Sequence, residues 1–350
     1  MAGPPGAVAR LRSAVRTGLA ASAEPVLVAC SGGPDSVALA AAIAFEAPRA
    51  GVAAGGLTVD HGLQAGSADR AQATAALLRE LGLAPVRVLT VAVGEDGGPE
   101  AAARGARYAA LAGAARDTGG GAARVALGHT LDDQAETVLL GLGRGSGPRS
   151  VAGMVEERVT ETAGGRVPWW RPLLGVRRET TRQACADQGL PVWDDPWNDD
   201  PAYTRVRLRT EVLPLLEDVL GGGVAAALAR TAGQLREDLD ALDHLAAAQL
   251  ARLPAGDGLP ATDLAALPAA LRRRVLRGWL LAGAVPDLQA VHLASVDGLL
   301  TRWHGQGRVD LPGGAGVLRS SGRLVLLPPG VPRAAGADQH PPTARSSTRD

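Results

Sequence analysis

The chain has 350 residues, enough for one large and one smaller domain, and its 36 basic side chains balance 36 acidic ones, which excludes binding of polyanions through overall charge. No lysine occurs, so phosphate must be bound by arginine guanidinium groups or by backbone N–H groups. Cys30 and Cys185 are too far apart for a Cys-x-x-Cys motif, which argues against a disulfide scaffold or a local zinc or iron–sulfur site. No apolar stretch has the uninterrupted length of a membrane span. We therefore expect a cytoplasmic protein.

The first half of the chain alternates between two apolar patterns. Residues 25–30 form a short continuous apolar run, typical of a strand buried on both faces, and residues 35–47 have a helical pattern. The alternation predicts a parallel sheet with helices on both faces, hence an α/β fold. The further predicted elements are a strand at 51–62, a helix at 67–82, a strand at 84–93, a helix at 99–118, a strand at 123–129 and a helix at 131–142.

The second half is less regular. Residues 147–200 have a turn-rich pattern with four tryptophans, and residues 204–250 are predicted to be mainly helical with a break at Gly221–Gly223. After Pro254 we expect Ala/Leu helices, then short strands with glycine turns at 307–327. The predicted organisation is an N-terminal helix or extension at 1–20, a catalytic domain at 21–220, a helical linker at 221–253, a small domain at 254–328 and a disordered tail at 329–350.

Polar residues follow three of the predicted strands directly. Parallel sheets bind ligands at the carboxyl ends of their strands, so this topology selects Ser31–Ser36, Asp60–Gly62 and His129–Asp133 as candidate site residues.

The Ser31–Ser36 segment, Ser-Gly-Gly-Pro-Asp-Ser, is a candidate phosphate loop. Adjacent glycines let backbone N–H groups approach a ligand closely, and the following helix N-terminus favours anions. Asp35 fits a phosphate site only if a divalent cation such as Mg²⁺ lies between them. A Walker motif is impossible without lysine. The alternative is an ordinary strand–turn–helix connection whose Ser and Asp cap the helix.

Asp133 and Glu136 lie three residues apart on one face of a predicted helix. Two carboxylates on one face require a cation or a shift toward protonation, and Mg²⁺ or the amino groups of a cationic ligand would satisfy them. The alternative is that these acids only complement the helix dipole. His129, just before this helix, is either a packing residue or a group that contacts a ligand or assists proton transfer.

The loop resembles the S-G-G-x-D-S pyrophosphate loop of the ATP-pyrophosphatase superfamily, whose members cleave ATP between the α and β phosphates. Further motifs follow in the order seen in the tRNA(Ile)-lysidine synthetase family: "LTVDHGL" (57–63), "EAAARGARYAAL" (100–111), "LGHTLDDQAETVLLGLGRGSGPRSVAGM" (127–154), "RPLLGVRRE" (171–179) and "DDPWNDDPAYTRVRLRTEVLPLLE" (194–217). The resemblance covers about residues 25–220. It implies a parallel-sheet, adenine nucleotide alpha-hydrolase-like ATP-pyrophosphatase domain, and residues 262–327 resemble the family's smaller, mainly helical or α+β, substrate-binding domain.

The resemblance also implies a reaction: ATP-dependent attachment of free L-lysine to C2 of the wobble cytidine of the CAU anticodon of isoleucine tRNA, giving lysidine through an adenylated intermediate. ATP and Mg²⁺ are then required, with Asp35 as the Mg²⁺ ligand and Asp133 and Glu136 holding lysine. Arg104 and Arg107, one helical turn apart, would meet the α-phosphate with Glu100 orienting one of them; a solvated helix face is the alternative. The implied catalytic residues are Asp35, Arg104, Asp133, Glu136 and His129, and the implied ATP-binding residues are Ser31, Gly32, Gly33, Pro34, Asp35, Ser36, Asp60 and His61.

Contacts with tRNA are expected from clustered arginines, although such runs often only solvate a helix. The spacing of Arg205, Arg207 and Arg209 alternates as on a strand. The candidates are Arg107, Arg171, Arg177, Arg178, Arg182, Arg205, Arg207, Arg209, Arg272, Arg273, Arg274 and Arg277. Trp169, Trp170, Trp193 and Trp197 either stack on an unpaired base or belong to the core.

Trp197 stands where the family usually has Ser, and Val206 where Asn is common, which puts local tRNA contacts in doubt. Because the chain ends early compared with longer members, we expect a form without the last C-terminal domain, and a homodimer is compatible with the sequence. Two alternatives remain open: another tRNA-modifying enzyme of this fold that thiolates its substrate, for which two distant cysteines are poorly suited, and a non-catalytic RNA-binding protein. A metabolite amidotransferase would need a glutaminase domain or an N-terminal cysteine.

Overall fold

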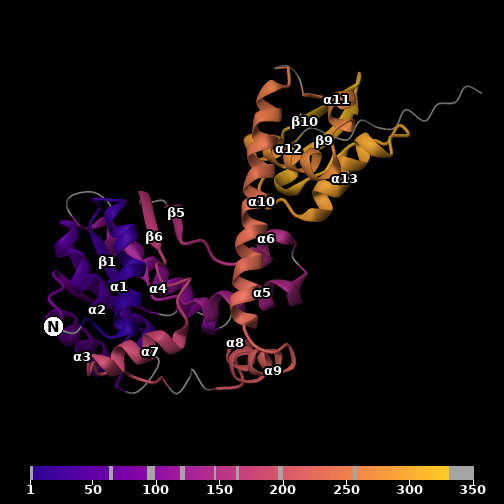
Figure 1. Cartoon of the computed structure of the whole chain (residues 1–350). Coiled ribbons are helices and arrows are strands. Elements are labelled where there is room, and N and C mark those ends of the chain that lie inside the picture. Colours follow the sequence, from indigo (N-terminus) through magenta and orange to yellow (C-terminus); the bar gives the residue numbers. More distant parts are fainter. Residues whose placement is uncertain are drawn as a thin grey trace, which may run out of the picture. The chain divides into compact units, whose positions relative to one another are not determined.

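The computed structural model describes residues 3–62, 66–92, 99–118, 123–145, 147–162, 165–195, 200–254 and 258–330. The chain divides into two units, Met1–Arg236 and Glu237–Asp350, and the long helix α10 (Val224–Arg252) contains the boundary (Figure 1). Trp197 and the tail after residue 330 lie outside the described residues.

A six-stranded sheet forms the centre of the first unit. Its order is β3 (Val86–Thr90), β2 (Ala54–Asp60), β1 (Val26–Ala29), β4 (Arg124–Leu127), β6 (Gly165–Trp170) and β5 (Glu157–Thr162). All neighbouring pairs are parallel except β5 with β6. The predicted parallel α/β sheet is therefore confirmed. The chain runs outward from β1 in both directions, so a ligand is expected where β1 and β4 end.

The alternating side chains of β1 bury both faces of the sheet. Val26 and Val28 pack with the helices α1 (Gly6–Ala20), α2 (Pro34–Glu46), α3 (Ser67–Glu80) and α7 (Arg178–Asp187), whereas Leu27 packs toward α4 (Pro99–Arg116). Figure 1 shows α1 and α2 beside β1. The helix predicted within residues 1–20 is α1, and its apolar stripe, with Leu11 and Val15 fully buried, belongs to the core.

The expectation of turns at 147–200 is wrong. The segment contains the short helix α6 (Pro148–Val151), the hairpin of β5 and β6, and α7. Because β5 is polar along its length, the apolar signal of a strand is missing there. Trp169 and Trp170 are 4 % and 0 % exposed and pack on opposite faces of the sheet, so both are core residues.

The expected helical region begins at residue 204 and breaks at Gly221–Gly223, whose φ angles are 78°, 89° and 76°. Its parts are α8 (Thr204–Arg207), a π-helical turn (Leu208–Val212), α9 (Leu213–Val219) and then α10. The strand-like spacing of Arg205, Arg207 and Arg209 is a wrong prediction, because the first two lie on α8 and the third on the π-helical turn that follows it.

The second unit contains a four-stranded antiparallel sheet, confirming the α+β expectation. Its order is β7 (Leu259–Pro260), β10 (Arg323–Leu327), β9 (Gly316–Ser320) and β8 (Val309–Asp310). The helices α11 (Ala261–Ala265), α12 (Ala269–Ala282) and α13 (Ala290–Thr301) share a core with it that includes Leu264, Leu276, Leu299 and Val317.

Among the described residues, no single helix has both the length and the apolarity needed to cross a membrane; one bent pair, Thr204–Val219 with Val224–Arg252, passes by length and composition when taken together.

Candidate active site

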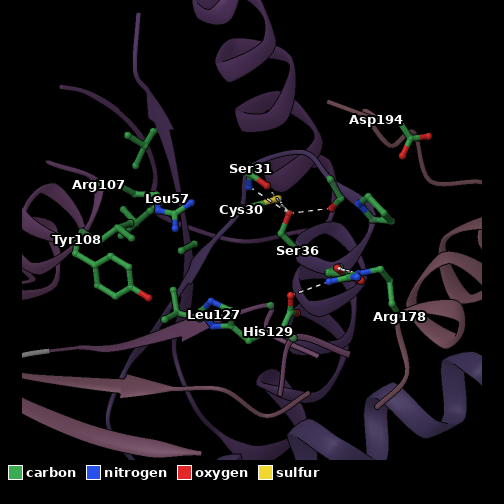
Figure 2. Close-up of a pocket in the computed structure, with 18 of the residues that line it drawn as sticks. Cys30, Ser31, Ser36, Leu57, Arg107, Tyr108, Leu127, His129, Arg178 and Asp194 are labelled. Atoms are coloured by element: carbon green, nitrogen blue, oxygen red, sulfur yellow. Dashed lines mark hydrogen bonds and ion pairs between the residues drawn. The ribbon is translucent and has the colours of Figure 1, made fainter. Parts of the chain in front are cut away.

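The predicted phosphate loop opens onto a cavity of about 330 Å³ at the carboxyl ends of β1 and β4 (Figure 2). Ser31, Gly33, Pro34, Asp35 and Ser36 line it. The Ser36 hydroxyl stabilises the loop, because it donates to the Gly33 carbonyl (2.9 Å) and accepts from the Ser31 N–H (3.2 Å).

Two glycines allow this loop to exist. Gly32 has φ +88°, and a Cβ there would lie 2.9 Å from the Thr74 hydroxyl. Gly128, which sequence analysis did not select, ends β4 against the first turn of α2, where a Cβ would lie 3.0 Å from the Asp35 carbonyl oxygen. Its position between a buried strand and His129 was the available signal.

Arg178 joins three carboxylates beside the loop. Its Nε lies 3.3 Å from Asp35, one Nη 2.7 Å from Asp133 and the other 3.3 Å from Glu136. Figure 2 shows Arg178 on one side of the cavity, joined by a dashed line to a carboxylate near His129. Burial lowers the pKa of Arg178, but Asp133, Glu136 and Asp35 more than offset this and raise it. The cluster therefore keeps a permanent positive charge among three acids.

Asp35 and Asp133 differ in their environment. Burial raises the pKa of Asp35, although Arg178 and a hydrogen bond from the Thr181 hydroxyl partly offset it. Burial alone would also raise the pKa of Asp133, but Arg178 and hydrogen bonds from the Thr130 N–H (2.7 Å) and hydroxyl (2.8 Å) lower it. Asp133 thus both caps α5 (Leu131–Arg144) and lines the cavity as a carboxylate.

Glu136 is 0 % exposed and does not line the cavity. Besides Arg178, it accepts from Arg209 Nε at 2.9 Å, and Arg205 Nη1 lies 3.8 Å away. Its carboxylate is therefore enclosed by guanidinium groups, and the predicted contact of Glu136 with lysine stays a prediction. Arg205 and Arg209 reach it together because they lie one helical turn apart. Arg207 instead pairs with exposed Glu211.

Two histidines line the cavity and are kept neutral. Burial lowers the pKa of His129 to about 4, and burial together with Arg107 lowers that of His61. The Nδ1 atom of each is buried and has no hydrogen-bond partner. Asp60 does not line the cavity; it accepts from the Ser67 hydroxyl (2.6 Å) and the Gly62 N–H (3.0 Å).

Arg107 and Tyr108 line the wall opposite Arg178 (Figure 2). Arg104 is exposed and donates to the Tyr108 hydroxyl at 3.3 Å, outside the cavity lining. The Glu100 side chain lies outside the described residues, so its expected contact with Arg104 or Arg107 is not tested.

Several other predicted residues serve the framework. Arg171 is 7 % exposed and donates to the Val155 carbonyl, so it presents no guanidinium to RNA. Arg177 pairs with Asp132, which also accepts from the Arg178 N–H at 2.8 Å. Arg182 pairs with Asp194 at the cavity rim, and the ring of Trp193 lies against Arg70. Cys30 and Cys185 are buried free thiols, and burial raises the pKa of Cys185 to about 11.

The predicted arginine cluster of the second unit is divided. Arg272 is 8 % exposed and pairs with buried Asp297 at 2.5 Å, so its guanidinium is engaged inside the second unit. Arg273, more exposed, shares Asp297, and Arg274 pairs with Asp243. Arg277 is exposed on the same helix.

Comparison with known proteins shows two matching families. The family described as "PP-loop domain" matches residues 8–216, and "TilS substrate binding domain" matches residues 259–325. The chain is 59 % identical to the tRNA(Ile)-lysidine synthase of Streptomyces coelicolor over 86 % of this chain and 84 % of that one. It is 54 % identical to the tRNA(Ile)-lysidine synthase of Thermobifida fusca over 93 % and 99 %.

A solved structure shares the fold. The U34-tRNA thiolase NcsA from Methanococcus maripaludis, described with its [4Fe-4S] cluster, superposes with a TM-score of 0.53 over 66 % of this chain and 80 % of that one. At 16 % identity, this likeness concerns the fold alone.

Proposed function

We propose a division of roles among the cavity residues from the premise that the chain belongs to the tRNA(Ile)-lysidine synthase family. It is therefore an ATP-dependent ligase that forms lysidine at the wobble cytidine of isoleucine tRNA. In that reaction the cytidine O2 attacks the α-phosphate and pyrophosphate leaves; the lysine ε-amine then displaces AMP from C2.

The phosphates of ATP lie against the Ser31–Ser36 loop and the N-terminus of α2, which offer backbone dipoles to anionic oxygens. Arg107, on the opposite wall, faces the α-phosphate, and exposed Arg104 extends the positive charge toward the entering tRNA. His61 and His129 contact the nucleotide as neutral imidazoles, because their pKa values are lowered.

The donor set fits Mg²⁺. Asp35 lines the cavity within the phosphate loop and already accepts from one cation, Arg178. No group of three or more metal-binding side chains occurs among the described residues, which agrees with the usual arrangement in which one or two carboxylates and ATP phosphates share the ion. Bound there, Mg²⁺ would neutralise the charge that develops on the leaving pyrophosphate.

Lysine is held by Asp133, which is the carboxylate with a lowered pKa that lines the cavity. Glu136 acts as a positioning residue: it orients Arg178, which in turn orients Asp35 and Asp133. The observation that carries the proposal is this placement of Arg178 and its carboxylates at the mouth of a phosphate loop.

The test separates the two half-reactions. Asp35→Asn should lose tRNA-dependent pyrophosphate release, whereas Asp133→Asn should lose mainly lysine transfer, by roughly 10- to 100-fold, the cost of one charge-assisted hydrogen bond. Substrates are ATP, labelled lysine and unmodified isoleucine tRNA, with nucleoside analysis of the product.

Excess lysine should restore turnover of Asp133→Asn. If it does not, and pyrophosphate release is equally impaired, Asp133 serves Mg²⁺ and not lysine. An Asp35→Asn enzyme that releases pyrophosphate at the wild-type rate would refute the assignment of the phosphate loop.

A further inference from the structure

The second unit carries an exposed tryptophan in the segment that follows α13. Trp303 keeps 38 % of its surface accessible, whereas the other tryptophans in the described ranges are buried or half-buried. A side chain of this size is normally covered. Its exposure in a unit that matches the family of a substrate-binding domain therefore points to a partner.

An arginine fixes the ring. The Arg319 guanidinium lies 5.2 Å from the Trp303 ring centroid, and Arg319 also donates to the Leu299 carbonyl at 3.1 Å. Arg319 on β9 thus links the Trp303 ring to the last turn of α13, and part of the indole surface stays open. A cation on an aromatic ring is a common element of surfaces that stack on nucleobases.

The loop around the ring is already ordered. Gln306 donates to the Arg302 carbonyl at 2.7 Å and accepts from the His304 N–H at 2.8 Å, and the His304 ring also contacts the Arg302 carbonyl. A loop that is preorganised loses less conformational entropy when it binds.

The charge of the loop fits a polyanion. The sequence from Gly298 to Val309 contains Arg302 and Arg308 and no acidic residue. Arg302 is exposed, and within the described part of the chain it forms no ion pair. The two acids that flank this segment in the sequence form ion pairs with other arginines: Asp297 with Arg272, and Asp310 with Arg308.

We propose that Trp303 stacks on an unpaired base of the bound tRNA while Arg302 contacts a neighbouring phosphate. An aromatic face beside a phosphate-binding cation is what an unstacked nucleotide requires, whereas the mixed polar surroundings do not offer the broad apolar patch of a protein interface. This inference rests on the proposed function, in which tRNA is the substrate.

The experiment uses the full chain and unmodified isoleucine tRNA. Trp303→Leu should bind tRNA about 5- to 100-fold more weakly, whereas Trp303→Phe, which keeps an aromatic face, should retain most of the affinity. Part of the tryptophan fluorescence that tRNA quenches in the wild type should be missing in both variants. Arg302→Gln should lower the slope of log affinity against log salt by about one.

Val291→Ala, at an exposed apolar position on α13, is the matched control and should bind like the wild type. Because ATP binds in the first unit, thermal unfolding followed by circular dichroism reports whether the second unit of each variant is folded. Wild-type affinity and quenching in Trp303→Leu would overturn this inference, as would a change only in oligomeric state. Either outcome leaves lysidine formation by the wild type intact, whereas failure of the proposed function would appear as a wild type that makes no lysidine.

Discussion

The pairing of Glu136 shows how much one buried charge determines in this site. Its carboxylate has no exposed surface and meets Arg178, Arg205 and Arg209. Without this carboxylate Arg178 keeps Asp35 and Asp133 as partners. Arg205 and Arg209 lose the buried carboxylate that they contact, and breaking such a pair is costly.

We therefore expect Glu136→Ala to lower the free energy of unfolding by about 3–5 kcal/mol, measured by urea denaturation. Glu211→Ala is the matched control: it breaks the exposed pair with Arg207, which solvent screens, and should leave the free energy of unfolding close to that of the wild type. Glu136→Gln, which keeps hydrogen-bonding capacity, should lose lysidine formation without rescue by lysine, in contrast to Asp133→Asn. Rescue by lysine would place Glu136 back among the lysine ligands.

The neutral His129 predicts a pH dependence of stability. Burial lowers its pKa from the ordinary 6.5 to about 4, so between these values the unfolded chain binds a proton that the folded chain does not. Stability from this residue is therefore complete above pH 6.5 and falls as the pH drops toward 4, by roughly 3 kcal/mol in all.

Unfolding free energies of the wild type and His129→Gln, measured from pH 7 to pH 4, should diverge from each other over this window. Two parallel curves would show that the proton on His129 does not distinguish the folded from the unfolded state.

At the scale of elements, the site depends on contacts between segments that are distant in the sequence. Asp132 at the start of α5 accepts from the backbone N–H of Arg178 at the start of α7, and Thr181 on α7 donates to Asp35 on α2. Three helices thus converge on one cluster, and each contributes its first turn or the residues next to it.

Helix α1 approaches the sheet closely at Gly18. A Cβ at this position would overlap the indole of Trp170, which is fully buried. Gly18→Ala should therefore destabilise the protein by about 1–3 kcal/mol despite the better helix propensity of alanine. Gly233→Ala, at an open position inside α10, should instead raise stability by up to about 1 kcal/mol, and thermal unfolding of the two variants distinguishes them. Equal effects would mean that α1 does not pack as described.

At the scale of the whole molecule, tRNA binding must come from local clusters because the net charge is zero. On α12 the exposed candidates are Arg273 and Arg277, whereas Arg272 is committed to Asp297. Replacing Arg273 and Arg277 by Gln should weaken tRNA binding and lower its salt slope by about two, one for each phosphate contact. Arg272→Gln should instead lower stability by about 3 kcal/mol.

Filter-binding titrations at several salt concentrations, with ATP binding as a control for folding, test this division. An unchanged slope in the double variant would remove α12 from the RNA-binding surface, and the two arginines would then only solvate the helix.

The sequence by itself determined the parallel sheet and the phosphate loop. Both follow from local patterns, since the period of apolar residues selects strand or helix and adjacent glycines after a buried strand mark a close approach to phosphate. The rule that ligands lie at the carboxyl ends of parallel strands also selected Asp35, Asp133 and His129 without knowledge of their partners. The β5–β6 hairpin was missed because an exposed edge strand carries no apolar run.

Only the tertiary structure decided which charges face the cavity and which are held inside. Arg178 lies 143 residues from Asp35 in the chain, so the spacing of residues in the sequence cannot predict their contact. Arg171 and Arg272 each belong to a segment with further arginines, yet packing buries these two to 7 % and 8 % exposure. The physical reason is that the burial and the partner of a charge depend on long-range packing, whereas sequence periodicity reports only the face of an element on which a residue lies.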